Sequence, residues 1–207
     1  MLEIKDATLV VGGQMMLSDC SFMANKGCIT AVFGQDSCTL TALLRAFLSL
    51  QPLQAGYVSV DGEQITPLSA STFRQMIAYV PCKFNFENST VADVFGAVCG
   101  KWYHVKSEQE MQLLQEWKRL SVERSYYNKV LTLLPLDVQQ RIMLSMATLL
   151  DRDVVLLDQP MAMQTEESMA CVASYIQAMK STDRVVCFTT TNPQVAQMAD
   201  TIVNITM

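Results

Sequence analysis

Glycine is scarce in this sequence. The chain of 207 residues contains 8 glycines, which is about 4% of the residues where average usage is about 7%. Glycine lets backbone amides approach a bound phosphate closely and takes a positive φ without strain. Few loops that depend on these two properties are therefore expected. The glycines fall at positions 12, 13, 27, 34, 56, 62, 96 and 100. Most of these positions are expected at turns or at the end of a strand, where they shape the fold.

Positive charge is also in short supply. The sequence has 15 Lys and Arg against 20 Asp and Glu, which gives a formal net charge of −5. Proteins that bind a phosphate backbone usually carry an excess of basic residues on one face. We therefore expect no nucleic-acid partner.

Long hydrophobic runs are missing. A membrane-spanning helix needs roughly 20 consecutive apolar residues, whereas the apolar run at residues 42–50 is short and contains Arg45. The first residues include Glu3, Lys5 and Asp6 and lack the basic-then-apolar order of a signal peptide. We expect no direct membrane insertion, so any involvement with a membrane must come through a partner.

Histidine is nearly absent, and the cysteines are not closely spaced. The single histidine is His104, and the seven cysteines, at positions 20, 28, 38, 82, 99, 171 and 187, show no C-x-x-C spacing. A structural zinc site needs four Cys or His ligands, so none is expected. Scattered cysteines of odd number are typical of small buried apolar residues in a reducing cytosol.

What the sequence does contain is an alternation of strand and helix patterns. Its length fits one large domain, or one domain with an insert. The apolar run at residues 28–33 predicts a buried strand, followed by a loop and a helical pattern at residues 40–48. Such alternation indicates an α/β fold with a mainly parallel sheet. Further strands are predicted at residues 56–62, 77–80, 154–157, 184–188 and 201–205, with helices in 90–150, at 166–179 and at 193–198.

Three motifs stand in the order found in one known family. Residues 139–160 read QQRIMLSMATLLDRDVVLLDQP, similar to the family's Q-R-V-x-L-A-R-A-L helix and its Walker B strand, which ends in D-E-P. Residues 186–203 match its switch strand and closing A-D step, and residues 78–94 resemble its Q-loop and the helix after it. The chain thus resembles the nucleotide-binding subunit of ABC transporters over nearly its whole length.

The resemblance implies an architecture. We expect an α/β fold like that of P-loop NTPases: a mainly parallel sheet with an N-terminal antiparallel β subdomain and an inserted helical subdomain. Residues 1–207 would form one ATPase-like domain. Its core would lie at 1–88 and 151–207, and its helical subdomain at about 89–150.

The family's phosphate loop, G-x-x-G-x-G-K-[ST]-T, wraps backbone amides around the phosphates and places a lysine on the outer two. Here Leu40 stands at the lysine position, and Asp36 adds a negative charge. The helix N-terminus behind the loop favours an anion by only about 0.3–1 kcal/mol. We therefore expect a vestigial loop. Its residues are Gly34, Gln35, Asp36, Ser37, Cys38, Thr39, Leu40, Thr41 and Ala42.

The other positions that the resemblance assigns to catalysis have also changed. Gln159 replaces the glutamate that polarises the attacking water, and the loss of a general base lowers a rate by about 10²–10⁴. Cys82 stands at the Q-loop glutamine, Thr190 at the switch histidine and Val11 at the aromatic residue that stacks on adenine. No active catalytic residue is therefore expected.

Two residues of the family's metal site remain. Thr41 keeps the hydroxyl and Asp158 the carboxylate that hold Mg²⁺ in the family. Both also fit ordinary structural roles, in the first turn of a helix and at the end of a strand. They would form a metal site only if Mg²⁺ is bound.

The family's signature, L-S-G-G-Q, caps the γ-phosphate held by a partner cassette, partly through a helix N-terminus. The matching residues bring no serine hydroxyl, and their proline lacks an N–H group. Their aspartate would face a phosphate of like charge. This vestigial signature consists of Leu134, Pro135, Leu136, Asp137 and Val138.

These changes favour a pseudo-ATPase, a cytoplasmic scaffold or regulatory subunit of a transport complex that binds no cofactor. Its expected partner is a membrane permease at the inner face of the membrane, an active cassette, or a second copy. Phe84 and Phe86, near the Q-loop position, are either a hydrophobic anchor for the permease or part of the core. Two alternatives stay open: a transporter subunit that binds or hydrolyses ATP weakly with Mg²⁺, and a self-associating structural module without a role in transport.

Overall fold

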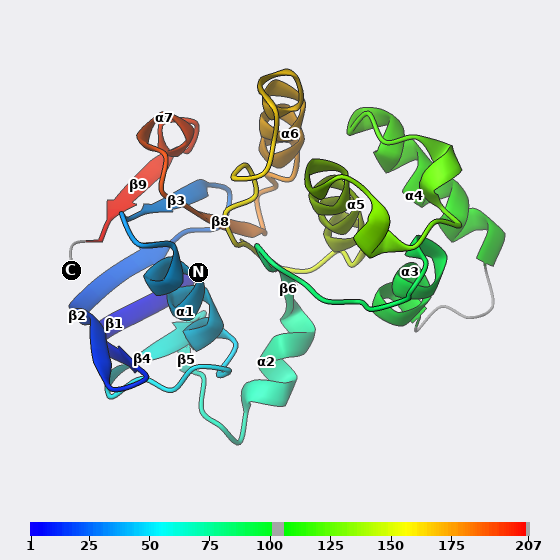
Figure 1. Ribbon diagram of the computed structural model, residues 1–207. Helices are drawn as coiled ribbons and strands as arrows, with labels where there is room; N and C mark the ends of the chain where they lie inside the picture. Colours follow the sequence, from blue (N-terminus) through cyan, green and yellow to red (C-terminus); the bar gives the residue numbers. More distant parts are fainter. Residues whose placement is uncertain (101–105, 206–207) are drawn as a thin grey trace. The chain divides into compact units, whose positions relative to one another are not determined.

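The computed structural model describes residues 1–100 and 106–205, which form two compact units (Figure 1). The first unit contains Met1–Pro81, Arg152–Gln159 and Lys180–Met207, and the second contains Cys82–Asp151 and Pro160–Met179. His104 lies outside the described residues. The second unit includes residues 160–179, which the sequence-based division assigned to the core. That division into functional domains stays a prediction.

An antiparallel sheet of four strands forms one part of the first unit. Its order is β2-β1-β4-β5. The turn between the first two strands is Gly12-Gly13, with φ values of 59° and 82°, a left-handed conformation that glycine adopts without strain. The strands are β1 (Leu2–Val11), β2 (Gln14–Ala24), β4 (Ala55–Val60) and β5 (Glu63–Gln64).

A second sheet in this unit has five parallel strands in the order β6-β7-β8-β3-β9. Strands β7 and β8 are buried along their whole length, which is why their sequences are continuous apolar runs rather than alternating patterns. The strands are β3 (Ile29–Phe33), β6 (Ile77–Val80), β7 (Val154–Leu157), β8 (Val185–Thr190) and β9 (Thr201–Asn204).

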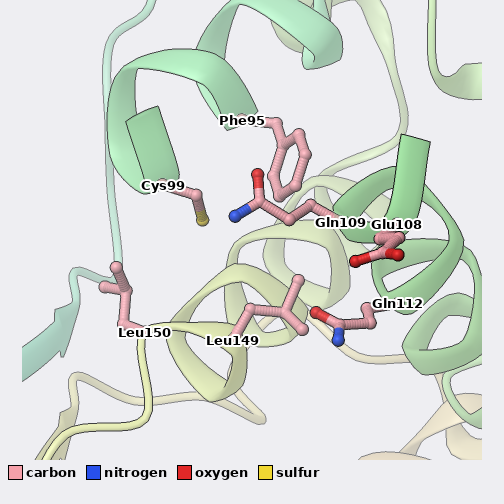
Figure 2. Close-up of a pocket in the computed structure, with 7 residues that line it drawn as sticks. All are labelled: Phe95, Cys99, Glu108, Gln109, Gln112, Leu149 and Leu150. Atoms are coloured by element: carbon pink, nitrogen blue, oxygen red, sulfur yellow. The ribbon is translucent and has the colours of Figure 1, made fainter. Parts of the chain in front are cut away.

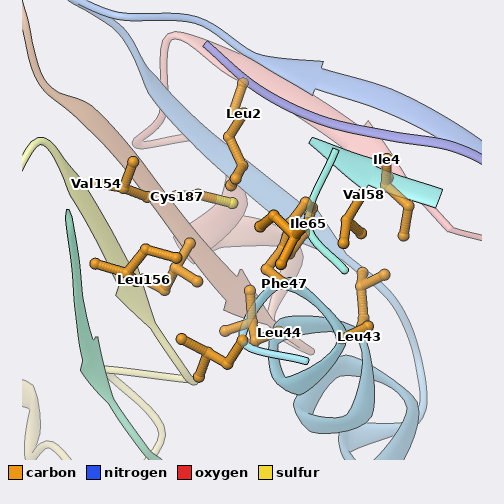
Figure 3. Close-up of a cluster of buried hydrophobic side chains, with 14 of the residues drawn as sticks. Leu2, Ile4, Leu43, Leu44, Phe47, Val58, Ile65, Val154, Leu156 and Cys187 are labelled. Carbon is orange, nitrogen blue, oxygen red and sulfur yellow. The ribbon is translucent and has the colours of Figure 1, made fainter. Parts of the chain in front are cut away.

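Helix α1 (Ser37–Phe47) joins the two sheets into one core. Leu43, Leu44 and Phe47 on this helix are fully buried. They belong to one cluster with residues of both sheets, including Leu2 of β1 and Leu156 of β7 (Figure 3). The unit also contains the short helices α2 (Ala70–Met76) and α7 (Pro193–Ala196).

The second unit is helical. Helix α3 begins with a capping box, in which Thr90 and Asp93 each accept a hydrogen bond from the other's backbone N–H. The buried Trp117 indole donates to Ser145 Oγ at 3.1 Å and so links α4 to α5. No helix in the described ranges is both long and apolar enough to cross a membrane. The elements are α3 (Val91–Cys99), α4 (Lys106–Arg119), α5 (Leu136–Leu149), α6 (Glu166–Ala178) and the 3₁₀ turns η2 (Arg124–Tyr126) and η3 (Leu131–Leu133).

The predicted α/β class, with an N-terminal antiparallel sheet and a parallel sheet, is confirmed. The helix predicted at 193–198 is shorter and ends at Ala196. The prediction of buried cysteines is right for Cys99 and Cys187 and wrong for Cys38, which is exposed. Cys38 lies in the first turn of α1, whose buried side is formed by residues such as Leu40 and Leu43.

The core around α1 gives the first prediction. Phe47→Ala removes a fully buried ring and leaves a cavity between the sheets, so we expect it to lower the free energy of unfolding by about 3–5 kcal/mol. Leu50→Ala, at a side chain that is 51% exposed, is the matched control and should change stability by less than about 0.5 kcal/mol. Equal midpoints for the two variants in urea denaturation would contradict this description of the core.

Candidate functional site

The candidate residues of the first unit follow three neighbouring strands. Strands β7, β8 and β3 lie side by side in the parallel sheet. Gly34 follows β3, Asp158 follows β7, and Thr190 ends β8. Because the carboxyl ends of parallel strands meet at one edge of a sheet, the three segments come together there.

Asp36 caps the helix that starts at this edge. Its carboxylate accepts hydrogen bonds from Cys38 N at 3.3 Å, Thr39 N at 2.8 Å and Thr39 Oγ1 at 2.6 Å. The first N–H groups of a helix have no partner within the helix, and they are the groups that bind phosphate in a phosphate loop. The chain's own carboxylate therefore binds the amides that an external anion would use. These bonds, above all the one from the Thr39 hydroxyl, hold the pKa of Asp36 below its usual range.

Leu40, at the position of the family's lysine, belongs to the hydrophobic core. It is fully buried, in the same cluster as Leu43 and Phe47. A β-carbon added at Gly34 would lie 3.4 Å from Leu40 Cδ2 and 2.8 Å from Ile205 Cγ1. The retained glycine is thus explained by close packing against these side chains.

Asp158, at the end of β7, accepts hydrogen bonds from three side-chain hydroxyls. Thr41 Oγ1 of α1 lies 2.8 Å from Oδ2, Tyr79 OH of β6 lies 3.4 Å from Oδ2, and Thr189 Oγ1 of β8 lies 3.1 Å from Oδ1. The carboxylate is 1% exposed. A buried carboxylate needs such donors because loss of its hydration is otherwise costly, and here three different elements supply them.

Gln159 is held by the same part of the fold. Its backbone N–H donates to Thr189 Oγ1 at 3.1 Å, and its side-chain Nε2 lies 3.5 Å from O of Ser37, the first residue of α1. Its φ is 49°, a conformation that is strained for residues other than glycine. The Thr189 hydroxyl therefore positions both residues that follow β7.

Three other sequence-predicted positions have separate surroundings. Thr190 Oγ1 accepts from Asn192 N at 3.1 Å, within the turn that leads to α7. Val11 is 37% exposed at the end of β1. Cys82 is partly buried and belongs to the second unit.

The vestigial signature also lies in the second unit, at the start of α5. Pro135 is the N-cap residue and provides no side-chain cap. The Asp137 carboxylate accepts from Arg141 Nη2 at 2.7 Å, and Arg141 Nη1 donates to Leu120 O at 2.8 Å. The charge of Asp137 is therefore paired within its own helix, by an arginine that is itself buried.

The phosphates of a nucleotide do not fit the start of α1 as it stands, because a carboxylate holds the amides and an apolar side chain replaces the ammonium. Thr41 and Asp158 are suitable ligands for a divalent cation, but they bind each other. In the described ranges, no group of three or more His, Cys, Asp and Glu side chains forms a further metal centre.

Sequence analysis missed Tyr79 and Thr189. Both donate hydrogen bonds to Asp158 from strands that flank β7. The available signals were the place of Tyr79 within the predicted strand 77–80 and the place of Thr189 directly after the predicted strand 184–188. The strand order was needed to bring both residues to the carboxylate.

Comparison with known proteins agrees with this geometry. The parallel sheet, with α1 after β3 and an aspartate after β7, defines an α/β fold of the P-loop NTPase type. Residues 17–162 match the family described as ABC transporter. Since this match covers well over half of the sequence, the chain belongs to the ABC transporter family, in its ATP-binding cassette.

Individual relatives are distant. The chain is 22% identical to the Fe(3+) ions import ATP-binding protein FbpC of Mannheimia succiniciproducens, over 78% of this chain and 45% of that protein. It is 27% identical to the spermidine/putrescine import ATP-binding protein PotA of Pasteurella multocida, over 78% of this chain and 43% of that protein. The chain thus spans less than half the length of these curated relatives.

A solved structure confirms the fold. A dimeric bacterial ABC transporter cassette superposes with a TM-score of 0.85 at 18% identity, covering 99% of this chain and 94% of that one. At this level of identity the likeness establishes the fold alone.

The cap on α1 gives the second prediction. Asp36→Ala should lower the free energy of unfolding at neutral pH by about 1 kcal/mol, because two helix amides lose their acceptor. Since the fold lowers the pKa of Asp36, this contribution is present above the unfolded-state value of 3.8 and is lost as the pH falls through the folded-state value. Urea denaturation of wild type and variant between neutral pH and about pH 3 measures the difference.

Asp36→Asn is the control, because an amide oxygen also caps a helix and carries no charge. We expect this variant to lose less stability than Asp36→Ala. The difference between these two variants should not change with pH near the pKa of a carboxyl group. A loss for Asp36→Ala that stays constant down to the lowest pH would show that the carboxylate does not hold the amides.

Proposed function

We propose that the chain is a pseudo-ATPase, an ABC cassette retained as a scaffold or regulatory subunit of a transport complex. The observation that carries this proposal is the start of α1. Leu40 is buried in the core, and the Asp36 carboxylate accepts from the amides of Cys38 and Thr39. In a phosphate loop, a lysine and open amides attract the phosphates. The chain would therefore have little or no affinity for ATP.

The residues after β7 and at the start of α5 support the same proposal. Gln159 carries a carboxamide, which cannot accept the proton of an attacking water. The signature position offers Pro135 and an aspartate paired with Arg141. Cassettes of this family join head to tail, so that each nucleotide lies between two subunits. In such a dimer this chain would impair its own site and that of its partner.

The transport role rests on the relatives. FbpC and PotA are import ATP-binding proteins, and the cassette with the same fold is dimeric. We propose a cytoplasmic chain at the inner face of the membrane, docked on a permease, on an active cassette or on a second copy. Phe84 and Phe86 are half-buried, with ring centroids 6.0 Å apart, and would supply an apolar anchor for the permease.

One observation favours a second candidate, a subunit that binds ATP weakly. The hydroxyl of Thr41 and the carboxylate of Asp158 lie 2.8 Å apart, so both residues of the family's Mg²⁺ site are already together. A cation bound there would replace their hydrogen bond and would neutralise charge near the start of α1. This candidate predicts that the chain binds ATP only when Mg²⁺ is present. The pseudo-ATPase proposal predicts no binding of ATP with or without Mg²⁺.

The third prediction separates these candidates. We titrate the purified chain with a fluorescent ATP analogue, with and without Mg²⁺, using PotA of Pasteurella multocida as positive control. The pseudo-ATPase predicts no saturable binding below roughly millimolar concentration, which corresponds to a binding free energy weaker than about −4 kcal/mol. Binding in the low micromolar range would overturn the proposal.

Two variants show whether weak binding of the ATP analogue depends on Thr41. Thr41→Val removes the hydroxyl next to Asp158 and should abolish binding that depends on Mg²⁺. Thr72→Val makes the same change at an exposed position on α2 and should leave binding unchanged. Mg²⁺-dependent binding that only Thr41→Val removes would establish the weakly binding subunit instead.

A further inference from the structure

The second unit contains a pocket with an apolar floor between three of its helices. Its volume is about 280 Å³, close to the lower end of the range for small-molecule sites. Phe95 and Cys99 come from α3, Leu149 is the last residue of α5, and Leu150 is its C-cap (Figure 2). Phe95 and Cys99 are each 7% exposed. This floor suits a ligand with a small apolar body, such as one aromatic ring.

The opposite wall is polar and comes from α4. Glu108, Gln109 and Gln112 line it. In Figure 2 the Gln109 amide points toward Cys99 and the ring of Phe95, and the carboxylate of Glu108 lies at the side of the pocket. Amides and carboxylates can all accept hydrogen bonds from a ligand. The pocket therefore combines an apolar floor with several acceptors.

The charges around the pocket favour a positive ligand. Among the described residues that line the pocket, Glu108 is the acidic one, and burial raises the pKa of the Cys99 thiol to about 11. Two helices end at the pocket, α3 at Cys99 and α5 at Leu149, and the C-terminal end of a helix carries a partial negative charge. The N-terminal end of α4 carries the opposite partial charge, and the full negative charge of Glu108 lies in its first turn.

We propose that this pocket binds a small organic cation that carries an apolar body. The ring or alkyl part would pack on Phe95 and Leu149, and the ammonium group would bind the Glu108 carboxylate and the amide oxygen of Gln109. A nucleotide is the wrong ligand, because its phosphates would face the carboxylate. This inference does not depend on the proposed loss of ATPase activity.

The fourth prediction uses three matched probes: phenethylamine, 2-phenylethanol and phenylacetate, which share a ring and differ in charge. Isothermal titration calorimetry on the whole chain should show the amine binding at least tenfold more tightly than the alcohol. The carboxylate should bind most weakly. Equal affinity for the three probes, or no binding of the amine at millimolar concentration, would overturn the proposal.

Variants locate the binding site. Glu108→Gln should reduce the preference for the amine over the alcohol at least fivefold, whereas Phe95→Leu should weaken both probes. Glu167→Gln is the matched control, because it removes a first-turn carboxylate from α6 at an exposed position that does not line the pocket. If Glu108→Gln leaves the preference for the amine unchanged, the cation binds elsewhere and the assignment fails. Circular dichroism checks that each variant is folded.

Discussion

The packing of α1 between the two sheets is the interaction on which the first unit depends. Its leucines and Phe47 are fully buried and join one cluster with residues of β1, β4 and β7. Full burial of one such side chain contributes about 1.5–3 kcal/mol, so the helix contributes much of the hydrophobic energy that holds the sheets together. Because the helix is fixed along its length, the position of its first turn is fixed as well.

That first turn determines the chemistry at the edge of the parallel sheet. Leu40 is the first core leucine of the helix, Asp36 caps it, and Thr41 points at Asp158. Hydrogen bonds to a buried charged acceptor such as Asp158 contribute about 1.5–3 kcal/mol each, whereas the more exposed cap at Asp36 contributes about 1 kcal/mol in total. The two carboxylates therefore stabilise the loop and the strand end with no bound ligand. In an active cassette, a nucleotide and its metal ion would occupy the same donors and acceptors.

The sequence alone predicts the parts of this arrangement that depend on local patterns. The apolar run of β3, the helical period after it and the order of the motifs predict the fold. Asp36 has a local signal too, because aspartate is a preferred N-cap residue. The hydroxyls of Tyr79 and Thr189 could not be assigned, since each meets Asp158 only through strand pairing across 79 and 31 residues of chain. The pocket of the second unit could not be predicted either, because its lining residues come from three helices that meet only in the folded chain.

Under the proposed function, the contacts of the first turn of α1 and those of the residues after β7 would oppose single substitutions that restore the family's catalytic pattern. A lysine at position 40 would lose the packing of a buried leucine, which is worth about 2–5 kcal/mol, and would have to bring its ammonium group out of the core. The amides of Cys38 and Thr39 would still hold the carboxylate of Asp36. A glutamate in place of Gln159 would add a second buried carboxylate beside Asp158, where like charges disfavour ionisation. Each of these two changes toward the family's pattern therefore conflicts with a contact that now stabilises the fold.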